Sequence, residues 1–166
     1  EVDRSMFDRQ IDLIMTEFAP VAQKFLKHVA KINGLEKMTF ADWKLDLDSA
    51  LNPDVTIDDA YELVMKSVAP LGEEYTREIA NYQKERWVDF AANAGKDSGG
   101  YATDPYRVHP YVLMSWTGRM SDVYTLIHEI GHSGQFIFSD NSQSYFNTHM
   151  STYYVEAPST FNELLL

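Results

Sequence analysis

The stretch VYTLIHEIGHSGQF, residues 123–136, combines an apolar helical pattern with two histidines and a glutamate. Successive residues of a helix turn by about 100° around its axis, so His128 and His132 would lie about 40° apart. The apolar side chains gather on the opposite side of that helix. They are Val123, Leu126, Ile127, Ile130 and Ile137. The pattern therefore predicts a helix that begins with Ser121 as N-cap, ends near Phe138 and presents both histidines on one polar face.

The run HEIGH, residues 128–132, has the spacing at which two imidazoles bind one Zn²⁺ ion. Glu129 lies too far round the helix to be a ligand, but it is placed to take a proton from water. The alternative is that these side chains form an ordinary polar helix face without a metal, because a motif this short also arises by chance. Burying the three side chains without partners would be costly, however, and a metal ion supplies those partners. The sequence thus favours a zinc site with Glu129 as the base.

A third ligand has to come from another segment, and it has to be His, Asp or Glu because the chain contains no cysteine. The stretch TYYVEAPSTFNELLL, residues 152–166, predicts a helix with Glu156 and Glu163 on the same face. The polar connector before it would let this helix fold back on the first. Pro158 suits a first helical turn and so places Glu156 near the connector. The residues alone leave the choice between Glu156 and Glu163 open.

Both motifs resemble those of the oligoendopeptidase F branch of the thimet oligopeptidase-like zinc metallopeptidases. A weaker likeness extends through GKDSGGYATDPYRVHPYVLMSW, residues 95–116, to the helical region upstream. The resemblance implies that the zinc ligands are His128, His132 and Glu156. It implies that Glu129 is the general base and that Glu163 steadies a ligand histidine. It also implies a mainly α-helical metallopeptidase core with a small β-sheet or edge strand beside the HExxH helix.

This resemblance predicts a zinc-dependent endopeptidase that hydrolyses internal bonds of short oligopeptides. Two alternatives stay open: a carboxypeptidase-type zinc peptidase, as in the angiotensin-converting-enzyme-like families, and a zinc-binding structural core without turnover. We expect the chain to be the catalytic core of a longer peptidase. In the family, a histidine and tyrosines beyond the glutamate helix stabilise the oxyanion, and losing one such donor typically costs about 10²–10³ in rate. A chain that ends at Leu166 is therefore expected to bind zinc and to turn over slowly.

The run HPYVLMSW, residues 109–116, predicts a short strand, and Pro110 suits an edge strand. Its free edge would pair with an extended peptide substrate, and a glycine pair just upstream would let that backbone approach closely. The candidate substrate-contacting residues are Gly99, Gly100, His109, Tyr111 and His149. For each, an ordinary structural role is the alternative.

The other segments are predicted to form the structural elements that support the site. Residues 3–31 carry apolar side chains at helical spacing, interrupted by Pro20. The remaining predictions are a short strand within 38–53, a helix over 58–68 capped by Thr56 or Asp58, a longer helix over 73–94 and a loop over 96–104. No repeat or flexible linker is visible, so a single domain over residues 1–166 is expected.

The composition excludes several partners. The 14 basic and 25 acidic residues give a net charge of −11, which repels nucleic acid and anionic membranes. No apolar run reaches the length of about 18 residues that a membrane span needs. The first ten residues lack the features of a secretion signal, so a cytoplasmic protein is expected. The resemblance implies that its partners are short peptide substrates. The oligomeric state is left open.

Overall fold

The computed structural model describes residues 3–45 and 53–166. It divides into two compact units, Glu1–Asn52 and Pro53–Leu166, which are described separately. Within the described residues, none of the helices combines the length and the apolar character that crossing a bilayer requires. The expectation of one domain over residues 1–166 stays a prediction.

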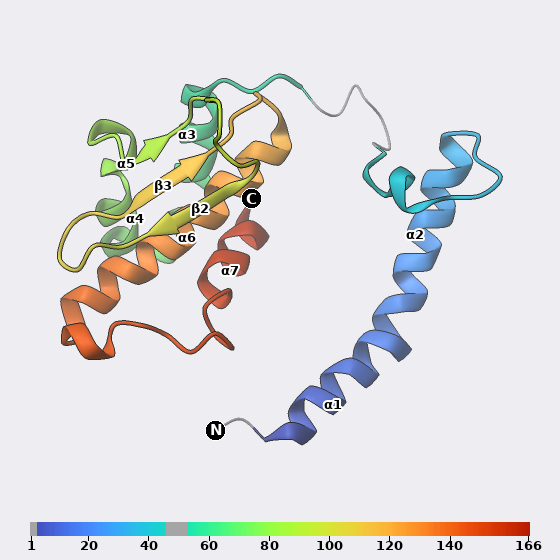
Figure 1. Ribbon diagram of the computed structural model, residues 1–166, viewed down its shortest axis with the longest axis horizontal. Coiled ribbons are helices and arrows are strands. Elements are labelled where there is room, and N and C mark those ends of the chain that lie inside the picture. Colours follow the sequence, from blue (N-terminus) through green and yellow to red (C-terminus); the bar gives the residue numbers. More distant parts are fainter. Residues whose placement is uncertain (1–2, 46–52) are drawn as a thin grey trace. The chain divides into compact units, whose positions relative to one another are not determined.

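The first unit is helical and consists of α1 (Arg4–Leu13), a π-helical turn η1 (Ile14–Phe18), α2 (Ala19–Ile32) and a 3₁₀ turn η2 (Phe40–Lys44). Figure 1 shows α1 and α2 as one continuous rod. Pro20 lies in the first turn of α2, and the Ala19 N–H donates to the Ile14 carbonyl five residues earlier. The predicted interruption at Pro20 is therefore a local widening of the helix, because a proline lacks the N–H that the regular ladder uses.

The prediction of a strand within residues 38–53 is wrong over Phe40–Lys44. There, Asp42 accepts hydrogen bonds from the backbone N–H and the hydroxyl of Thr39, both at 2.7 Å. This capping box stabilises a helical turn, and it outweighs the alternation of apolar and polar residues on which the strand was based. Residues 46–52 lie outside the described part of the chain.

The second unit begins with α3 (Ile57–Val68), η4 (Ala69–Leu71), α4 (Glu73–Ile79) and α5 (Asn81–Lys84). Thr56 is the N-cap of α3, which settles the choice between Thr56 and Asp58. The predicted single helix over 73–94 is wrong, because it is interrupted at Ala80 and ends at Lys84. Arg86 then adopts a left-handed conformation with φ 57°, which no α-helix can continue.

A three-stranded sheet follows, with β1 (Val88–Asp89), β2 (Gly100–Thr103) and β3 (Tyr111–Met114) in the order β1-β3-β2. β3 is parallel to β1 and antiparallel to β2, which pairs Gly100 with Met114 and Thr103 with Tyr111. The prediction that the run 109–116 offers a free edge is therefore wrong, because strands occupy both of its sides. One of them, β2, lies in the segment predicted as a loop. Pro110 precedes β3 and leaves its hydrogen bonds intact.

The HExxH motif lies on α6 (Met120–Ser142), which is followed by η5 (Tyr145–Asn147) and α7 (Ala157–Leu165). The N-cap is Arg119 in place of the predicted Ser121, and α6 ends four residues beyond the predicted Phe138. Four residues of its apolar face are fully buried against side chains of α3, α4 and the sheet, and Ile137 is partly buried; the four are Val123, Leu126, Ile127 and Ile130. In Figure 1 the sheet lies along α6, and α7 packs against the same helix. The fold thus agrees with the predicted mainly helical core with a small sheet.

Candidate metal centre

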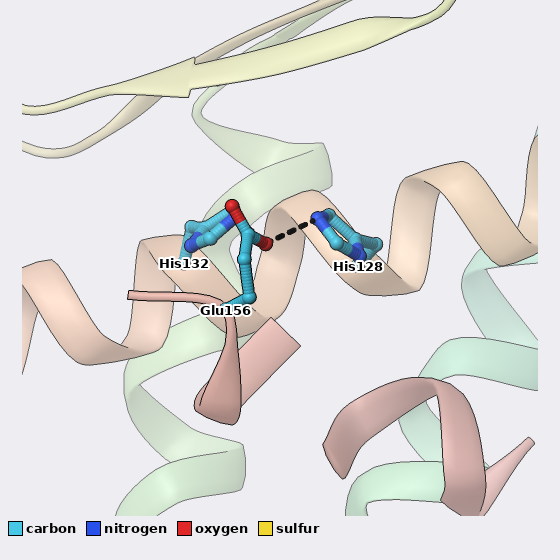
Figure 2. Close-up of side chains that lie close together, drawn as sticks. All are labelled: His128, His132 and Glu156. Atoms are coloured by element: carbon cyan, nitrogen blue, oxygen red, sulfur yellow. Dashed lines mark ion pairs between the residues drawn. The ribbon is translucent and has the colours of Figure 1, made fainter. Parts of the chain in front are cut away.

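Three side chains converge where α7 begins beside the middle of α6. The Oε2 atom of Glu156 lies 3.1 Å from Nε2 of His128 and 3.2 Å from Nε2 of His132. Figure 2 shows the carboxylate reaching from the α7 side into the space between the two imidazoles. One ligand atom from each residue falls within 4.8 Å of the others, so two nitrogens and one oxygen could share a metal ion.

Helix α6 brings the histidines together in the way that their spacing predicts. Their ring centroids lie 4.9 Å apart on one face of the helix. Burial lowers the pKa of His132, and the neighbouring His128 lowers it further, although Glu156 acts in the opposite direction. His132 is therefore neutral at pH 7, which is the form of an imidazole that binds metals. Its buried Nδ1 atom has no hydrogen-bond partner among the described residues.

Glu156 is held by a residue to which the sequence analysis assigned no role. The hydroxyl of Ser159 donates to Oε2 of Glu156 at 2.9 Å and to its carbonyl at 3.0 Å, and Ser159 is fully buried. Partial burial raises the pKa of Glu156, but the Ser159 hydrogen bond and the two histidines outweigh it and lower the pKa below its ordinary value. The carboxylate is thus kept ionised. A serine three residues after the glutamate at the N-cap of a helix is the signal that could have identified it.

Glu129 lies beside these three side chains and is 5% exposed. Its Oε2 atom has no hydrogen-bond partner among the described residues. Burial raises the pKa of Glu129 and the nearby Glu156 raises it further, against the opposing effects of His128 and the Ala102 backbone. A carboxyl group whose pKa is raised towards neutrality can both accept and return a proton.

Glu163 lies on the other side of His128 from Glu156. Its Oε1 atom is 2.5 Å from Nδ1 of His128. The geometry therefore distinguishes the two glutamates, which share one helix face in the sequence. Glu156 faces both Nε2 atoms, whereas Glu163 contacts Nδ1, the ring nitrogen of His128 on the side away from the candidate site.

A cavity of about 310 Å³ opens over the convergence point. It is lined by Gly100, Tyr101, Ala102, His128, Glu129, His132, Phe136, Val155 and Glu156. Of the residues predicted to contact substrate, Gly100 therefore lies in this cavity. A Cβ atom at Gly100 would lie 3.3 Å from Cγ of Glu129, so the glycine lets β2 approach α6 closely. Tyr101 and Ala102 were not predicted as site residues, because their segment was expected to be a loop.

The other predicted substrate residues are not among those that line the cavity. Gly99 immediately precedes β2 and has φ 89°, a conformation that favours glycine. His109 stacks on Trp87 with 5.5 Å between ring centroids. Tyr111 lines a separate hollow beside the sheet. Nδ1 of His149 lies 3.3 Å from the hydroxyl of the preceding threonine. Their roles in substrate binding stay predictions.

Comparison with known proteins agrees with this architecture. Residues 5–166 match the model of peptidase family M3. Oligopeptidase PepF of Bacillus subtilis (strain 168) is 30% identical over 165 residues, which cover 99% of this chain and 24% of that protein. An oligoendopeptidase F homolog of Borreliella burgdorferi is 30% identical over 167 residues, which cover 99% and 28%. The chain thus spans about a quarter of the length of these relatives.

Solved structures share the fold. A Chlamydophila abortus protein assigned as a peptidase has a TM-score of 0.79 and 29% identity, covering 99% of this chain and 27% of that one. PZ peptidase A with inhibitor 2 has a TM-score of 0.77 at 23% identity, covering 98% and 29%. At this identity, the likeness to PZ peptidase A concerns the fold alone. The chain therefore belongs to peptidase family M3, and its relatives include an oligopeptidase and an oligoendopeptidase F homolog.

Proposed function

We propose that His128, His132 and Glu156 bind one Zn²⁺ ion and that the protein hydrolyses internal bonds of short oligopeptides. The convergence of two Nε2 atoms on one carboxylate oxygen, at 3.1 and 3.2 Å, carries the proposal. Ligand atoms about 2.0 Å from a tetrahedral zinc ion lie about 3.3 Å from one another, so these distances fit the ion. Three protein ligands leave the fourth position that a catalytic site needs for water.

Glu129 would carry the proton in this reaction. When bound, zinc supplies Lewis-acid chemistry, because it acidifies water and polarises the scissile carbonyl. Glu129 accepts the proton as the water oxygen bonds to the carbonyl carbon. It then donates that proton to the amine nitrogen as the C–N bond breaks. The raised pKa of Glu129, caused first by its burial, suits both steps.

The substrate would lie along β2 and not along β3. Among the described strands β2 is one of the two at an edge of the sheet, and three of its residues, Gly100, Tyr101 and Ala102, line the cavity. An extended peptide can pair with such an edge through its backbone, which leaves side-chain selection to the rest of the cavity. The preference for short peptides is supported by the relatives, which are named oligopeptidases and oligoendopeptidases.

Metal content and cleavage of an internally quenched oligopeptide, with and without a chelator, test the proposal. We expect one zinc ion per chain and cleavage that the chelator abolishes. Glu129→Gln should retain the zinc and lose nearly all turnover, whereas His128→Ala should lose both. Cleavage that survives the chelator would overturn the proposal.

Mass spectrometry of the products separates the alternatives. Internal cuts support an endopeptidase, and stepwise removal of C-terminal residues supports a carboxypeptidase-type enzyme. Tight zinc binding without cleavage by the protein would support a structural core. A cytoplasmic location stays a prediction from the sequence.

A further inference from the structure

A buried polar network lies behind the candidate metal centre, where α4 and α7 approach α6. Nδ2 of Asn162 donates to the Tyr75 hydroxyl at 2.8 Å and to the Ile127 carbonyl at 3.3 Å. The Tyr75 hydroxyl donates in turn to the Ile130 carbonyl at 3.4 Å. Asn162 is 2% exposed. Two side chains from different helices thus bond to each other and to the backbone of the HExxH helix.

Two glycines of α6 make room for this network. A Cβ atom on Gly134 would lie 2.5 Å from Cε2 of Tyr75, and one on Gly131 would lie 2.6 Å from Cα of Ser159. Both distances are shorter than non-bonded carbon atoms allow. Helix α6 therefore carries no side chain at the two positions where Tyr75 and α7 approach it.

No apolar side chain of α7 is fully buried. Its two buried residues are Ser159 and Asn162, both polar, whereas Phe161 and Leu164 are exposed, and Leu166 directly after the helix is partly buried against the core. Most helices in proteins are stabilised mainly by the packing of an apolar face. The position of α7 therefore relies unusually strongly on hydrogen bonds. Of these, the bonds made by Asn162 reach both α4 and α6.

The network is linked directly to the metal ligands. Asn162 precedes Glu163 in α7, and the carbonyl that it contacts belongs to the residue before His128. Glu156 lies at the N-terminal end of the same short helix. A shift of α7 along α6 would therefore move Glu156 away from the two imidazoles and Glu163 away from His128.

We propose that Tyr75 and Asn162 are positioning residues of the zinc site. Their hydrogen bond holds α7 in register with α6, and this register sets the spacing between Glu156 and the two histidines. The inference rests on the proposed zinc-binding function and assigns to this function two residues that do not themselves contact the ion.

Tyr75→Phe tests the inference, because it removes the hydroxyl and keeps the ring that stacks on Phe138. We expect zinc affinity to fall about tenfold, the lower end of the loss seen when residues that support metal ligands are changed. The visible absorption spectrum of Co²⁺ bound in place of zinc should also change, since it reports the ligand geometry. Asn162→Leu should have the same effects.

The double variant should lose less zinc-binding free energy than the sum of the two single losses, because both changes remove one shared bond.

Tyr82→Phe is the matched control. Tyr82 is 1% exposed, and its hydroxyl has no hydrogen-bond partner among the described residues. Removing it should leave zinc affinity and the Co²⁺ spectrum as in the unmodified chain. All variants are checked for cooperative unfolding by circular dichroism.

The outcomes separate the inference from the function on which it rests. If folded Tyr75→Phe and Asn162→Leu bind zinc with unchanged affinity and an unchanged Co²⁺ spectrum, the positioning role is wrong and the zinc site stands. If the unmodified chain binds no zinc, the proposed function fails and the inference falls with it. A loss in Tyr82→Phe equal to that in Tyr75→Phe would also overturn the inference, because the effect would then not depend on the bond.

Discussion

Glu163 contacts the imidazole of His128 on the side opposite the candidate metal centre, with Oε1 2.5 Å from Nδ1. Such a contact fixes the orientation and protonation of a ligand histidine and typically contributes about 10–100-fold to metal affinity. We therefore expect Glu163→Ala to weaken zinc binding by about this factor. Glu163→Gln should lose less, because an amide oxygen can still accept the Nδ1 hydrogen. Competition with a chromophoric chelator measures both.

Glu62→Gln provides the control for charge. Glu62 is an exposed glutamate of α3 that pairs with Lys66 one turn away, and it is absent from the residues that line the metal cavity. Its replacement should leave zinc affinity unchanged. Equal affinities for Glu163→Ala and the unmodified chain would show that Glu163 does not support His128.

The spacing of HEIGH was enough to predict that the two histidines share a helix face, whereas the residues alone left the choice between Glu156 and Glu163 open, for a physical reason. Residues one helical turn apart share a face in any regular helix, so HEIGH needs no tertiary information. Glu156 and Glu163 also share a face, and they differ only in how α7 folds back onto α6. That arrangement depends on close contacts such as the one between Gly131 and Ser159, which join segments far apart in the chain.

The sheet was the least predictable part of the fold. β1 has two residues and β2 has four, which is too short for an alternating pattern to be distinguished from a loop. Gly100 further weakened the signal of β2, although the close approach of this strand to Glu129 requires that glycine. The polar network of Tyr75 and Asn162 had no signal either, because each is a single residue in an ordinary helical segment.

Gly131→Ala should destabilise the protein although alanine is the better helix former. The helical preference favours alanine by about 1 kcal/mol. The added Cβ would lie 2.6 Å from Cα of Ser159 and 2.8 Å from the Pro158 carbonyl oxygen, and both are backbone atoms that cannot rotate away. Overpacking of this kind typically costs about 1–3 kcal/mol or more, so the balance is expected to be a net loss. Urea unfolding with a chelator present measures it.

Asn141→Ala in the same helix separates the helical preference for alanine from the effect of overpacking. Asn141 is exposed and lies in the last turns of α6, so alanine gains helical preference there without a steric conflict. Its stability should be equal or higher. If Gly131→Ala is also stabilising, then α7 must move freely enough to accept the methyl group.

The cap of α3 predicts a pH dependence of stability. Asp59 accepts hydrogen bonds from the Thr56 hydroxyl at 2.6 Å and from its backbone N–H at 3.3 Å, and these bonds lower the pKa of Asp59. Because the folded pKa lies below the unfolded value, the ionised carboxylate stabilises the fold above the unfolded pKa of about 3.9. This contribution is lost as the pH falls through the folded pKa.

Asp59→Asn should therefore be less stable than the unmodified chain at neutral pH, and the difference should shrink in acid. Chemical unfolding at a series of pH values measures it. In a Thr56→Ala background, which lacks the hydroxyl donor, Asp59→Asn should change the pH dependence less. A difference in stability that is the same at neutral and acid pH would contradict the role of the ionised cap.

Gly100→Ala should affect Glu129 and spare the metal ligands. The new Cβ would lie 3.0 Å from Cγ2 of Thr125, 3.2 Å from the Leu113 carbonyl oxygen and 3.3 Å from Cγ of Glu129, so these side chains or β2 itself must shift slightly. A base displaced by a fraction of an ångström is expected to lower kcat by about tenfold or more. Zinc affinity should stay unchanged, because neither Thr125 nor Glu129 is a proposed ligand.

Thr125→Ser is the control, because it removes the crowding Cγ2 atom. The Gly100→Ala, Thr125→Ser double variant should therefore recover part of the lost kcat. If zinc affinity and kcat instead fall together, the substitution disturbs the whole site and the effect cannot be assigned to Glu129.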